Sequence, residues 1–510
     1  MNDYAHGAPM SDADVSAAPV LVWFRDDLRL ADNPALHQAC AQGRPVVAVY
    51  VFDTQSPELR APGGAARWWL AQSLRALNAA LDRHEVPLVM RQGRADLVIP
   101  ALAETFGAAE VLFNARAGAA ETQVDGRVVE KLRAAGCAVR GFNANLLHKP
   151  GSILTAAGTL PRTFSSFQRA ARKERHLRAP YPAPASIRPY RLPAPEEALE
   201  AVLEAWGLEP KTPDWSGGLR AAWACGEAAA QRQLADFLDN GLRGYADRRD
   251  YPARPGVSRL SPHLRFGEIS PLQVLHAARH ACAAGAAPER DADKFEAELY
   301  WREFSHHVLN AEPDLLRRNL QPAFDSFPWQ DSADHMTAWS RGLTGYPIVD
   351  AGMRELWQTG WMHNRIRMVV ASFLSKHLLI DWRAGEDWFW DTLVDADLAS
   401  NPCNWQWVAG TGLDAAPYFR IFNPVLQGEK FDTDGAYVRQ FVPELAQLPA
   451  SVIHKPWTAD SATLARAGVR LGTTYPKPLV DHAAARERAL QAFAHIKGKG
   501  DGPAGSEEHH

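Results

Sequence analysis

Short apolar runs alternate with amphipathic stretches in the first part of the chain, between about Pro19 and Leu147. The amphipathic stretches, among them residues 67–84 and 121–135, have the spacing of helices that bury one face. Alternation of strands and helices is typical of a parallel sheet with helices on both faces. The five runs that we expect to be its strands are VLVWF, VVAVYVF, PLVMR, EVLFN and AVRGF.

Beyond this region the pattern changes twice. A cluster of prolines predicts that residues 148–225 form a long linker without regular elements. The pattern of residues 226–497 is helical, and Ser261-Pro262 and Ser270-Pro271 each combine a capping serine with a proline that favours a helix start.

These boundaries predict two domains. A Rossmann-like α/β domain with a parallel sheet occupies residues 19–147, and an all-α domain follows the linker at residues 226–497. A chain of 510 residues is too long for one hydrophobic core, because single cores stop growing at about 250–300 residues. The tail, residues 498–510, is polar and glycine-rich, so we expect it to be disordered.

Composition narrows the class of protein. Apolar residues make up 46% of the chain, and no stretch approaches the roughly 20 apolar residues that span a bilayer. The first residues lack a basic segment followed by an apolar run, so we expect no secretory signal and a cytoplasmic, soluble protein. Five scattered cysteines argue against a disulfide framework or a zinc site. No GxGxxG follows the first strand, so we expect a tightly held cofactor elsewhere in the chain.

An arginine-rich segment, residues 245–271, contains Ser258-Arg259-Leu260-Ser261 at a predicted helix start. Hydroxyl groups, backbone N–H groups and a guanidinium at a helix N-terminus can bind phosphate. A solvated basic loop with an ordinary helix cap explains the same residues equally well. The segment alone leaves both interpretations open.

Two further segments place polar residues on helix faces. In residues 295–309, the spacing i, i+3, i+4 and i+7 predicts that one face carries Glu298, Trp301, Arg302 and Ser305. Such a face indicates either a site or an exposed helix with a local Glu-Arg pair. In residues 359–382, one face is predicted to carry Asn364, Arg367 and Met368.

The second of these helices continues into VVASFL, which is apolar all round and therefore predicted to be buried. Arg365 and Arg367 at its start need partners, because burying an unpaired charge is costly. Asp395 and Asp397 are the candidate partners, and a purely structural Arg-Asp pair would explain them as well.

These segments, together with VLVWFRDDLRLADNPAL, TGYPIVDAGMRELW and GTGLDAAPYFRIFNPVLQGEKFDTDGAYVRQFVPEL, resemble the photolyase and cryptochrome family. The resemblance extends from about Val20 to Lys497 and is closest to the class I photolyases that repair cyclobutane pyrimidine dimers. It implies an N-terminal antenna-binding domain and a C-terminal helical domain that binds FAD. It also implies that excited reduced FAD gives an electron to the dimer, whose ring then opens.

The resemblance assigns roles to individual residues. FAD would be bound by Tyr245, Val257, Ser258, Arg259, Leu260, Ser261, Phe295, Arg302, Asn364, Arg367, Asp395, Asp397 and Asn401. The lesion would be held by Glu298, Trp301, Asn364, Met368 and Trp407, and the DNA by Arg249, Glu298, Arg365, Arg420 and Gln427. Of the 17 tryptophans, three would pass electrons to the flavin: Trp405, Trp382 and Trp329.

Some positions depart from the family pattern. Val257 stands where a threonine is common, and Phe295 stands where a tryptophan can lie near the flavin. Glu121 matches an antenna-contacting glutamate, but Ala120 replaces an asparagine beside it. The antenna site is therefore open between methenyltetrahydrofolate, another chromophore such as a deazaflavin or flavin, and no chromophore.

Three other functions compete with dimer repair. A cryptochrome would keep FAD and the tryptophans without repairing DNA. A (6-4) photolyase should have two histidines in the helix where MHNRIRM contains only His363. A light-independent flavin-binding or nucleic-acid-binding module would not need spaced tryptophans. We expect DNA with cyclobutane pyrimidine dimers as the partner, and a monomer.

Overall fold

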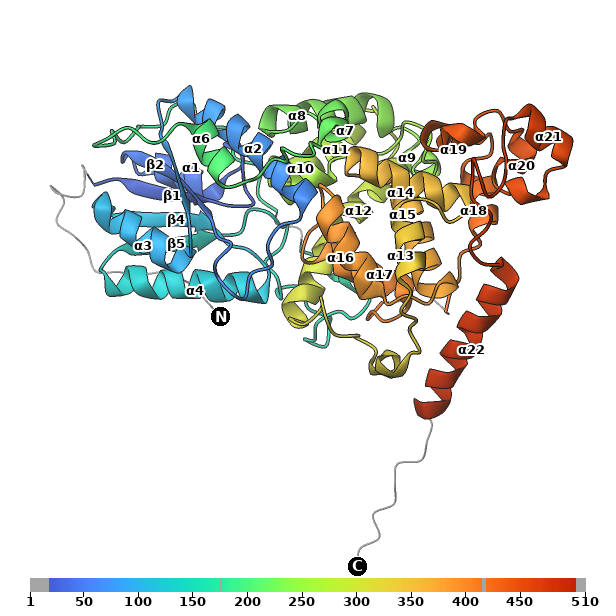
Figure 1. Cartoon of the computed structure of the whole chain (residues 1–510). Helices are drawn as coiled ribbons and strands as arrows, with labels where there is room; N and C mark the ends of the chain where they lie inside the picture. Colours follow the sequence, from blue (N-terminus) through green and yellow to red (C-terminus); the bar gives the residue numbers. More distant parts are fainter. Residues whose placement is uncertain (1–17, 175–176, 415–418, 501–510) are drawn as a thin grey trace, which may run out of the picture. The chain divides into compact units, whose positions relative to one another are not determined.

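The computed structural model describes residues 18–174, 177–414 and 419–500, with the side chains of the last three left out. The chain forms two compact units (Figure 1). The first contains the chain up to residue 246 together with residues 256–313 and 394–399. The second contains residues 247–255, 314–393 and the chain from residue 400 onward. The boundaries that the sequence suggested for its domains stay a prediction.

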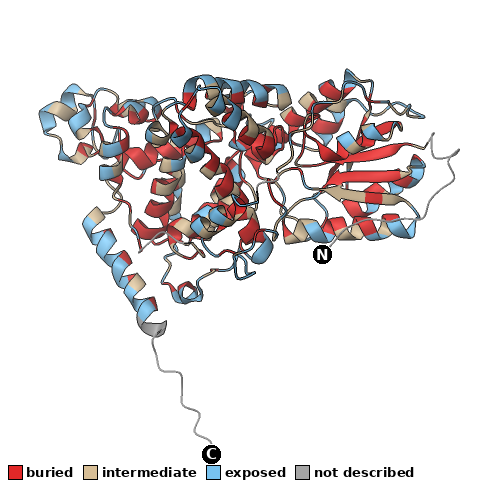
Figure 2. Ribbon diagram, turned by 180° about the vertical axis from the view of Figure 1, so that it is seen from behind, coloured by how far each residue is buried: buried red, intermediate tan, exposed pale blue. Residues whose placement is uncertain are grey.

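The predicted parallel sheet is confirmed. Its strands lie in the order β3-β2-β1-β4-β5, and every pair is parallel. The strands are β1 (Val20–Phe24), β2 (Val46–Phe52), β3 (Leu88–Gln92), β4 (Glu110–Asn114) and β5 (Ala138–Phe142). All residues of β1, β2 and β4 are buried, as Figure 2 shows for the strands in red, because a parallel sheet is covered on both faces.

Helices cover both faces of this sheet. Val20, Val22 and Phe24 of β1 pack in a core with helices α1 (Pro34–Ala41) and α2 (Gly64–Asp82). The alternate residues, Leu21 and Trp23, pack in a second core with α3 (Ala95–Thr105) and α4 (Ala119–Ala134). The two cores follow from the strand period of two, which sends successive side chains to opposite faces.

The linker contains three helices, so the prediction that it lacks regular elements is wrong. They are α5 (Phe164–Ala171), α6 (Leu199–Ala205) and α7 (Gly217–Ala222). The prolines between residues 180 and 195 fall between α5 and α6, where no helix forms. Proline therefore excludes helix only from the segment that contains it.

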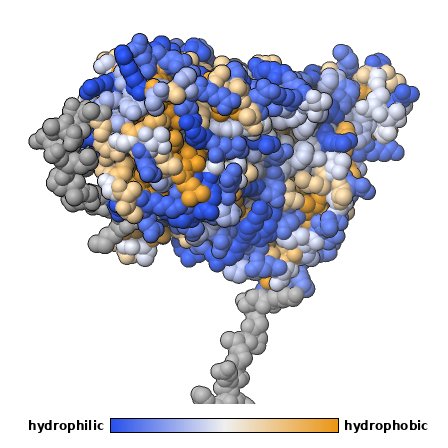
Figure 3. Space-filling model, turned by 60° about the vertical axis from the view of Figure 1, so that its left-hand side comes forward, coloured by the Kyte–Doolittle hydropathy of each residue, from blue (hydrophilic) through white to orange (hydrophobic). Residues whose placement is uncertain are grey.

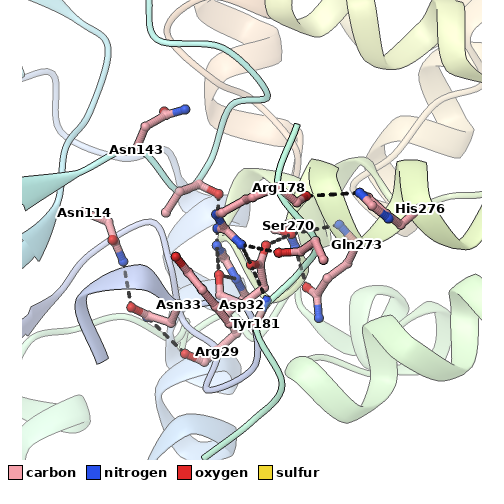
Figure 4. A network of polar contacts seen from close by, with 12 residues as sticks. Arg29, Asp32, Asn33, Asn114, Asn143, Arg178, Tyr181, Ser270, Gln273 and His276 are labelled. Carbon is pink, nitrogen blue, oxygen red and sulfur yellow. Dashed lines mark hydrogen bonds and ion pairs between the residues drawn. The ribbon is translucent and has the colours of Figure 1, made fainter. Parts of the chain in front are cut away.

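A polar network around Asp32 ties the linker to the rest of the first unit (Figure 4). The Asp32 carboxylate accepts from the Arg178 guanidinium, from the Tyr181 backbone N–H at 3.0 Å and from the Ser270 hydroxyl. Ser270 also caps α11 (Pro271–Ala283) by accepting from the Gln273 N–H at 3.0 Å, as predicted. Because the buried Asp32 carboxylate is satisfied by Arg178, Tyr181 and Ser270, the segment around Tyr181 is fixed to the loop after β1.

The predicted helical pattern after residue 226 is confirmed. Its helices up to residue 311 are α8 (Glu227–Asp236), the π-helix η1 (Phe237–Gly241), α9 (Tyr245–Arg248), α10 (Ser261–Arg265), α11 and α12 (Glu289–Ala311). Ser261 was predicted to cap α10, but it is the first residue of this helix. The helix begins one position earlier than expected, and Leu260 takes the capping position.

The remaining helices belong to the second unit. They are η2 (Pro322–Ser326), α13 (Ala333–Ser340), α14 (Pro347–Thr359), α15 (Asn364–Ser372), the π-helix η3 (Phe373–His377), α16 (Trp382–Thr392), α17 (Ser400–Ala409), α18 (Pro424–Phe431), α19 (Ala436–Phe441), η4 (Pro443–Leu445), α20 (Ala450–Ile453), η5 (Pro456–Thr458), α21 (Ser461–Arg466) and α22 (His482–Gly500). Because α22 runs to Gly500, the first tail residues are helical, and residues 501–510 lie outside the described residues.

Hydrophilic residues predominate on the face of the molecule in Figure 3, and apolar residues gather there in a few patches. Among the described residues, no helix is both long enough and apolar enough to cross a membrane.

Candidate functional site

Helix α12 of the first unit carries Glu298, Trp301 and Arg302, and the three side chains are half-buried. Glu298 forms an ion pair with Lys294, one turn earlier, at 3.4 Å. Arg302 donates to the carbonyl oxygens of Asn145 at 2.7 Å and Leu264 at 3.3 Å. These three residues therefore share an accessible face, as predicted from their spacing.

Ser305 does not belong to the accessible part of this face. Its side chain is buried, and its hydroxyl donates to the Trp301 carbonyl oxygen at 3.0 Å. Such a bond to the preceding turn satisfies the hydroxyl inside the helix. Ser305 therefore has a structural role on this face, and the accessible residues are Glu298, Trp301 and Arg302.

The predicted phosphate-binding segment has a special backbone conformation. Arg259 is in the left-handed region with φ of 51°, and its guanidinium lies 4.3 Å from the ring centre of Trp223. The Ser258 hydroxyl accepts from the Leu260 N–H at 3.4 Å, and its carbonyl accepts from Gln233 at 3.0 Å. Left-handed backbone at a non-glycine residue is uncommon and often marks a functional loop.

Aromatic side chains position the residues on either side of this segment. Tyr245 is buried, and its ring meets the ring of Phe295 edge-on at 5.5 Å and 85°. Phe237 contacts both rings, at 5.6 Å from Tyr245 and 4.6 Å from Phe295. The predicted FAD contacts Tyr245 and Phe295 are thus neighbours in the first unit.

Two aspartates of the first unit complete its part of the predicted flavin site. The Asp397 carboxylate accepts from the Ala399 N–H at 2.8 Å, and Asp395 is buried. Burial lowers the pKa of Arg302, whereas the nearby Asp397 carboxylate acts in the opposite direction. The charge of Asp397 therefore helps to keep the half-buried Arg302 guanidinium charged.

Helix α15 of the second unit begins with the predicted lesion residues. Asn364 is exposed and Met368 is half-buried, and the amide nitrogen of Asn364 lies 4.0 Å from the Met368 sulfur. Residues Val369 to Leu374 are buried, as predicted. The two side chains thus share the accessible face of a helix whose continuation lies in the core.

The partner of Arg365 differs from the prediction. Arg365 forms an ion pair with Asp250 at 2.7 Å, and its guanidinium lies 4.4 Å from the ring centre of Phe431. Arg367 donates to the Met362 carbonyl oxygen at 2.7 Å. Asp395 and Asp397 are therefore not needed to neutralise Arg365, and the pairing of Arg367 with Asp395 stays a prediction.

Asn401 on α17 has a fixed orientation. Its amide nitrogen donates to the carbonyl oxygen of Glu386 at 3.1 Å and to the Glu386 carboxylate at 2.7 Å. Both side chains are buried, at 8% exposure for Asn401 and 0% for Glu386. Because an amide NH₂ group has two donors, these bonds use both, and the side-chain oxygen is directed away from Glu386 as an acceptor.

Three tryptophans of the second unit form a graded series. Trp405 and Trp382 are buried, and Trp329 is half-buried. A Cβ atom on Gly385 would lie 2.2 Å from the Trp405 ring, so this ring packs directly on α16, one turn from Trp382. Gln330 follows Trp329, and its backbone N–H donates to the Leu379 carbonyl oxygen at 2.7 Å. Because Leu379 is close in sequence to Trp382, this bond ties the segment of Trp329 to that of Trp382.

The other predicted DNA contacts also belong to the second unit. Arg420 is exposed, Gln427 on α18 is half-buried, and Arg249 lies 3.9 Å from Asp250. Arg420 is therefore accessible to a phosphate, whereas the Arg249 side chain is only 11% exposed.

Glu121 has a local structural role. It accepts from the Gly118 N–H at 3.1 Å at the start of α4 and lies 3.4 Å from the Arg116 guanidinium. Burial raises the pKa of this carboxyl, and Arg116 opposes the shift. A helix cap explains Glu121 without an antenna, so its antenna role stays a prediction.

Four supporting residues had not been identified from the sequence. Glu386 orients Asn401, Asp250 pairs with Arg365, Asn319 accepts from the Trp382 indole at 2.9 Å, and Phe164 stacks on Trp301. Each is distant in sequence from the residue it contacts, so no local spacing could have indicated it.

Two family descriptions match the chain. The family described as "DNA photolyase" matches residues 20–185. The family described as "FAD binding domain of DNA photolyase" matches residues 295–495, which contain Trp301, Asn364 and Asn401.

Similar proteins cover nearly the whole chain. A deoxyribodipyrimidine photo-lyase of Agrobacterium fabrum is 49% identical over 483 residues, which cover 95% of this chain and 99% of that protein. Cryptochrome-1 of Arabidopsis thaliana is 38% identical over 484 residues, covering 93% of this chain and 70% of that protein. The solved structure of a bacterial class III photolyase from Agrobacterium tumefaciens is 48% identical, with a TM-score of 0.91 over 96% of this chain and 99% of that one.

A parallel α/β domain followed by a helical FAD-binding domain defines a two-domain flavoprotein. The chain belongs to the DNA photolyase and cryptochrome family. FAD is its cofactor, and the residues fit this group. Ser258, Arg259 and Ser261 have donor groups that would suit a diphosphate, and the oriented amide oxygen of Asn401 would suit a ring N–H, so their roles toward FAD stay predictions.

Proposed function

We propose that this protein is a deoxyribodipyrimidine photolyase that uses blue light and reduced FAD to split cyclobutane pyrimidine dimers in DNA. The observation that carries the proposal is a contrast in exposure between neighbouring tryptophans. Trp407 is half-buried, whereas Trp405, two residues earlier on α17, is only 2% exposed. Trp301 and Glu298 on α12 are also half-buried. The residues assigned to the lesion are thus accessible, and the residue assigned to electron transfer is enclosed.

The comparisons support repair over signalling. The photo-lyase of Agrobacterium fabrum is 49% identical and the Arabidopsis cryptochrome 38%. Within the photolyases, the class I likeness of the motifs stays a prediction, since the similar structure from Agrobacterium tumefaciens is described as a class III enzyme.

In this proposal the chain binds and orients the damaged bases, and bound FAD supplies the light-driven electron that opens the ring. Photolyases are among the enzymes that extrude their target from the duplex, and a dimer stacks poorly to begin with. Trp301 and Trp407 stack on the extruded bases, which contributes about 1–3 kcal/mol per base. Glu298 hydrogen-bonds a base edge and stabilises the charge that develops there.

The tryptophan series supplies electrons when the flavin is oxidised. Trp405, Trp382 and Trp329 lead from the core of the second unit to a half-buried ring. Asn401, held by Glu386, has an amide oxygen that would accept a hydrogen bond from an N–H group of bound FAD. DNA is held by arginines of the second unit, among them Arg249, Arg365 and Arg420.

The test is repair of an oligothymidine that contains cyclobutane dimers. Purified, reduced protein is illuminated with blue light, and recovery of thymine absorbance is recorded beside a dark control. We expect light-dependent recovery that falls at least about tenfold in Glu298→Ala, because a charge-stabilising hydrogen bond is lost. Glu289→Ala, which removes an exposed carboxylate from the first turn of the same helix, is the matched control and keeps full activity. Failure to repair by protein with photoreducible FAD would refute the proposal.

The second candidate is a cryptochrome that binds FAD without repair. Cryptochrome-1 matches 93% of this chain, which is the observation in its favour. It predicts light-driven reduction of the flavin without recovery of thymine absorbance, so the same assay separates the two functions.

A (6-4) photolyase is the weakest of the alternatives. His363 is buried and accepts from the Arg365 N–H at 3.1 Å as the cap of α15. Burial lowers its pKa to about 4, so the ring is neutral at pH 7. A neutral capping histidine has a structural function and is not placed as a proton donor to a lesion.

A further inference from the structure

Trp301, assigned above to the lesion, is itself stacked on another aromatic ring. Its ring centre lies 3.7 Å from that of Phe164, and the two planes differ by only 5°. Phe164 is the first residue of α5, in the linker, and both residues belong to the first unit. Both side chains are half-buried, so the pair lies at the edge of the core and not inside it.

Helix α5 holds Phe164 rigidly. Thr163 caps the helix by accepting from the Ser166 N–H at 3.4 Å. Phe167, one turn after Phe164, is fully buried and packs against Phe304 at 5.6 Å and His307 at 4.7 Å, both on α12. The short helix is therefore anchored to the helix that carries Trp301.

A third ring restrains the stacked pair from the side. Phe304 meets Phe164 edge-on at 6.2 Å and 72°, and Trp301 at 6.1 Å and 76°. Edge-on contacts are favourable in themselves, whereas two rings 3.7 Å apart and nearly parallel have little of the offset that isolated pairs prefer. The packing of α5 on α12 thus imposes the parallel stack and fixes the plane of the Trp301 ring.

We propose that Phe164 is a positioning residue for lesion recognition, which holds the Trp301 indole in the plane on which a damaged base stacks. This inference rests on the proposed function. Phe164 covers one face of the half-buried indole, so we expect the base to stack on the opposite face. A ring that is already ordered loses no rotamer freedom when the base binds, which favours binding.

The test measures binding of an oligothymidine with a single cyclobutane dimer, in the dark, by fluorescence anisotropy. We expect Phe164→Leu, which fills similar space without a flat ring, to raise the Kd about three- to tenfold. We expect Phe164→Tyr, which keeps the flat ring, to restore the wild-type value. In the repair assay, the same positioning effect raises the KM for Phe164→Leu more than it lowers kcat, and Phe164→Tyr reverses the rise in KM. A flavin content equal to that of the wild type verifies that each variant folds.

Two controls separate positioning from packing. Phe167→Leu keeps an apolar side chain at the buried anchor of the same helix, and the ring contacts of Phe167 among the described residues are with Phe304 and His307, so its Kd should stay within about twofold of the wild type. In a Trp301→Ala background, Phe164→Leu should have no further effect on the Kd.

Each other result overturns the inference. Equal losses in Phe164→Leu and Phe167→Leu indicate a packing effect, and tighter binding by Phe164→Leu indicates that Phe164 covers the face that the base needs. If Trp301→Ala weakens binding and Phe164→Leu does not, only this inference fails. If the wild type binds damaged and undamaged oligothymidine equally, the proposed function fails.

Discussion

Beyond strand β1 of the first unit, buried and half-buried guanidinium groups are paired with carboxylates. The helical core of the second unit instead buries an ammonium group beside a carbonyl oxygen and an aromatic ring. In the first unit Arg25 is paired with Asp125, and Arg265 with Asp26 at 2.7 Å. In the second, Lys376 is 1% exposed, donates to the Arg420 carbonyl oxygen at 3.1 Å and lies 3.9 Å from the ring centre of Phe419.

The comparison of the two units separates polar groups that are used up in structural pairs from polar groups that can still bind a ligand. A buried ion pair is expected to hold its element in place, since either charge alone would be costly. Asn401 in the second unit, in contrast, uses its donors on Glu386 and directs its amide oxygen elsewhere. Trp405 and Trp382 add redox-active rings to that core. The second unit therefore combines buried groups that folding alone does not require.

Removal of Asp125 should have the largest effect. Asp125→Ala leaves the 6% exposed Arg25 guanidinium without its carboxylate, so we expect the free energy of unfolding to fall by about 3–5 kcal/mol. Urea denaturation followed by circular dichroism measures the change in the transition of the first unit. Glu204→Ala, which breaks the exposed pair with Lys211, is the control and should change stability by less than about 0.5 kcal/mol. A loss of similar size in both variants would show that burial of the pair is unimportant.

Replacement of Lys376 tests the opposite arrangement. Burial lowers the pKa of this amine from 10.5 to about 7, so between these values the unfolded chain binds a proton that the folded chain lacks. Stability is therefore lost as the pH falls through this window and is constant below it. Lys376→Met removes this penalty, and we expect it to be more stable than the wild type by about 2–4 kcal/mol near pH 7.

The pH dependence distinguishes this explanation from a general gain in packing. The difference between Lys376→Met and the wild type should shrink as the pH rises from about 7 to 10, because the penalty fades there. Lys430→Met changes an exposed lysine on α18 and should show no such trend. A constant difference across the range would contradict a lowered pKa for Lys376.

The sequence predicted features that depend on neighbouring residues, and it missed features that depend on packing between distant segments. The five strands were placed to within one residue, because β1 and β2 consist of continuous apolar runs that only a doubly covered sheet accommodates. The face of Glu298 and Trp301 was found because helical spacing is local. Helix α5 was missed because eight residues between irregular segments owe their helix to packing on α12 and not to propensity.

Partners distant in sequence could not be predicted in the same way. Asp250 pairs with Arg365 across 115 positions, and Glu386 reaches Asn401 from the preceding helix. Only the fold brings such residues together, and several acidic residues were equally suitable from spacing alone. The family resemblance identified Asn401 and Arg365 but not the groups that orient them.

Two helical glycines, one in each unit, provide the comparison with the smallest expected changes in stability. A Cβ atom on Gly385 of α16 would lie 2.2 Å from Trp405 and 2.6 Å from Leu374, whereas one on Gly126 of α4 would meet nothing within 4 Å. Gly126→Ala should raise stability by about 0.5–1 kcal/mol, because alanine loses less backbone entropy in a helix. Gly385→Ala should instead lower it by about 1–3 kcal/mol, because the core must shift to admit the methyl group.

The shift displaces Trp405, so light-driven reduction of oxidised FAD should slow in Gly385→Ala and not in Gly126→Ala, while chemical reduction of the flavin proceeds in both. If both variants are more stable than the wild type, the core around Trp405 can accept an added methyl group. The tight packing that places this ring one turn from Trp382 would then not be needed for electron transfer.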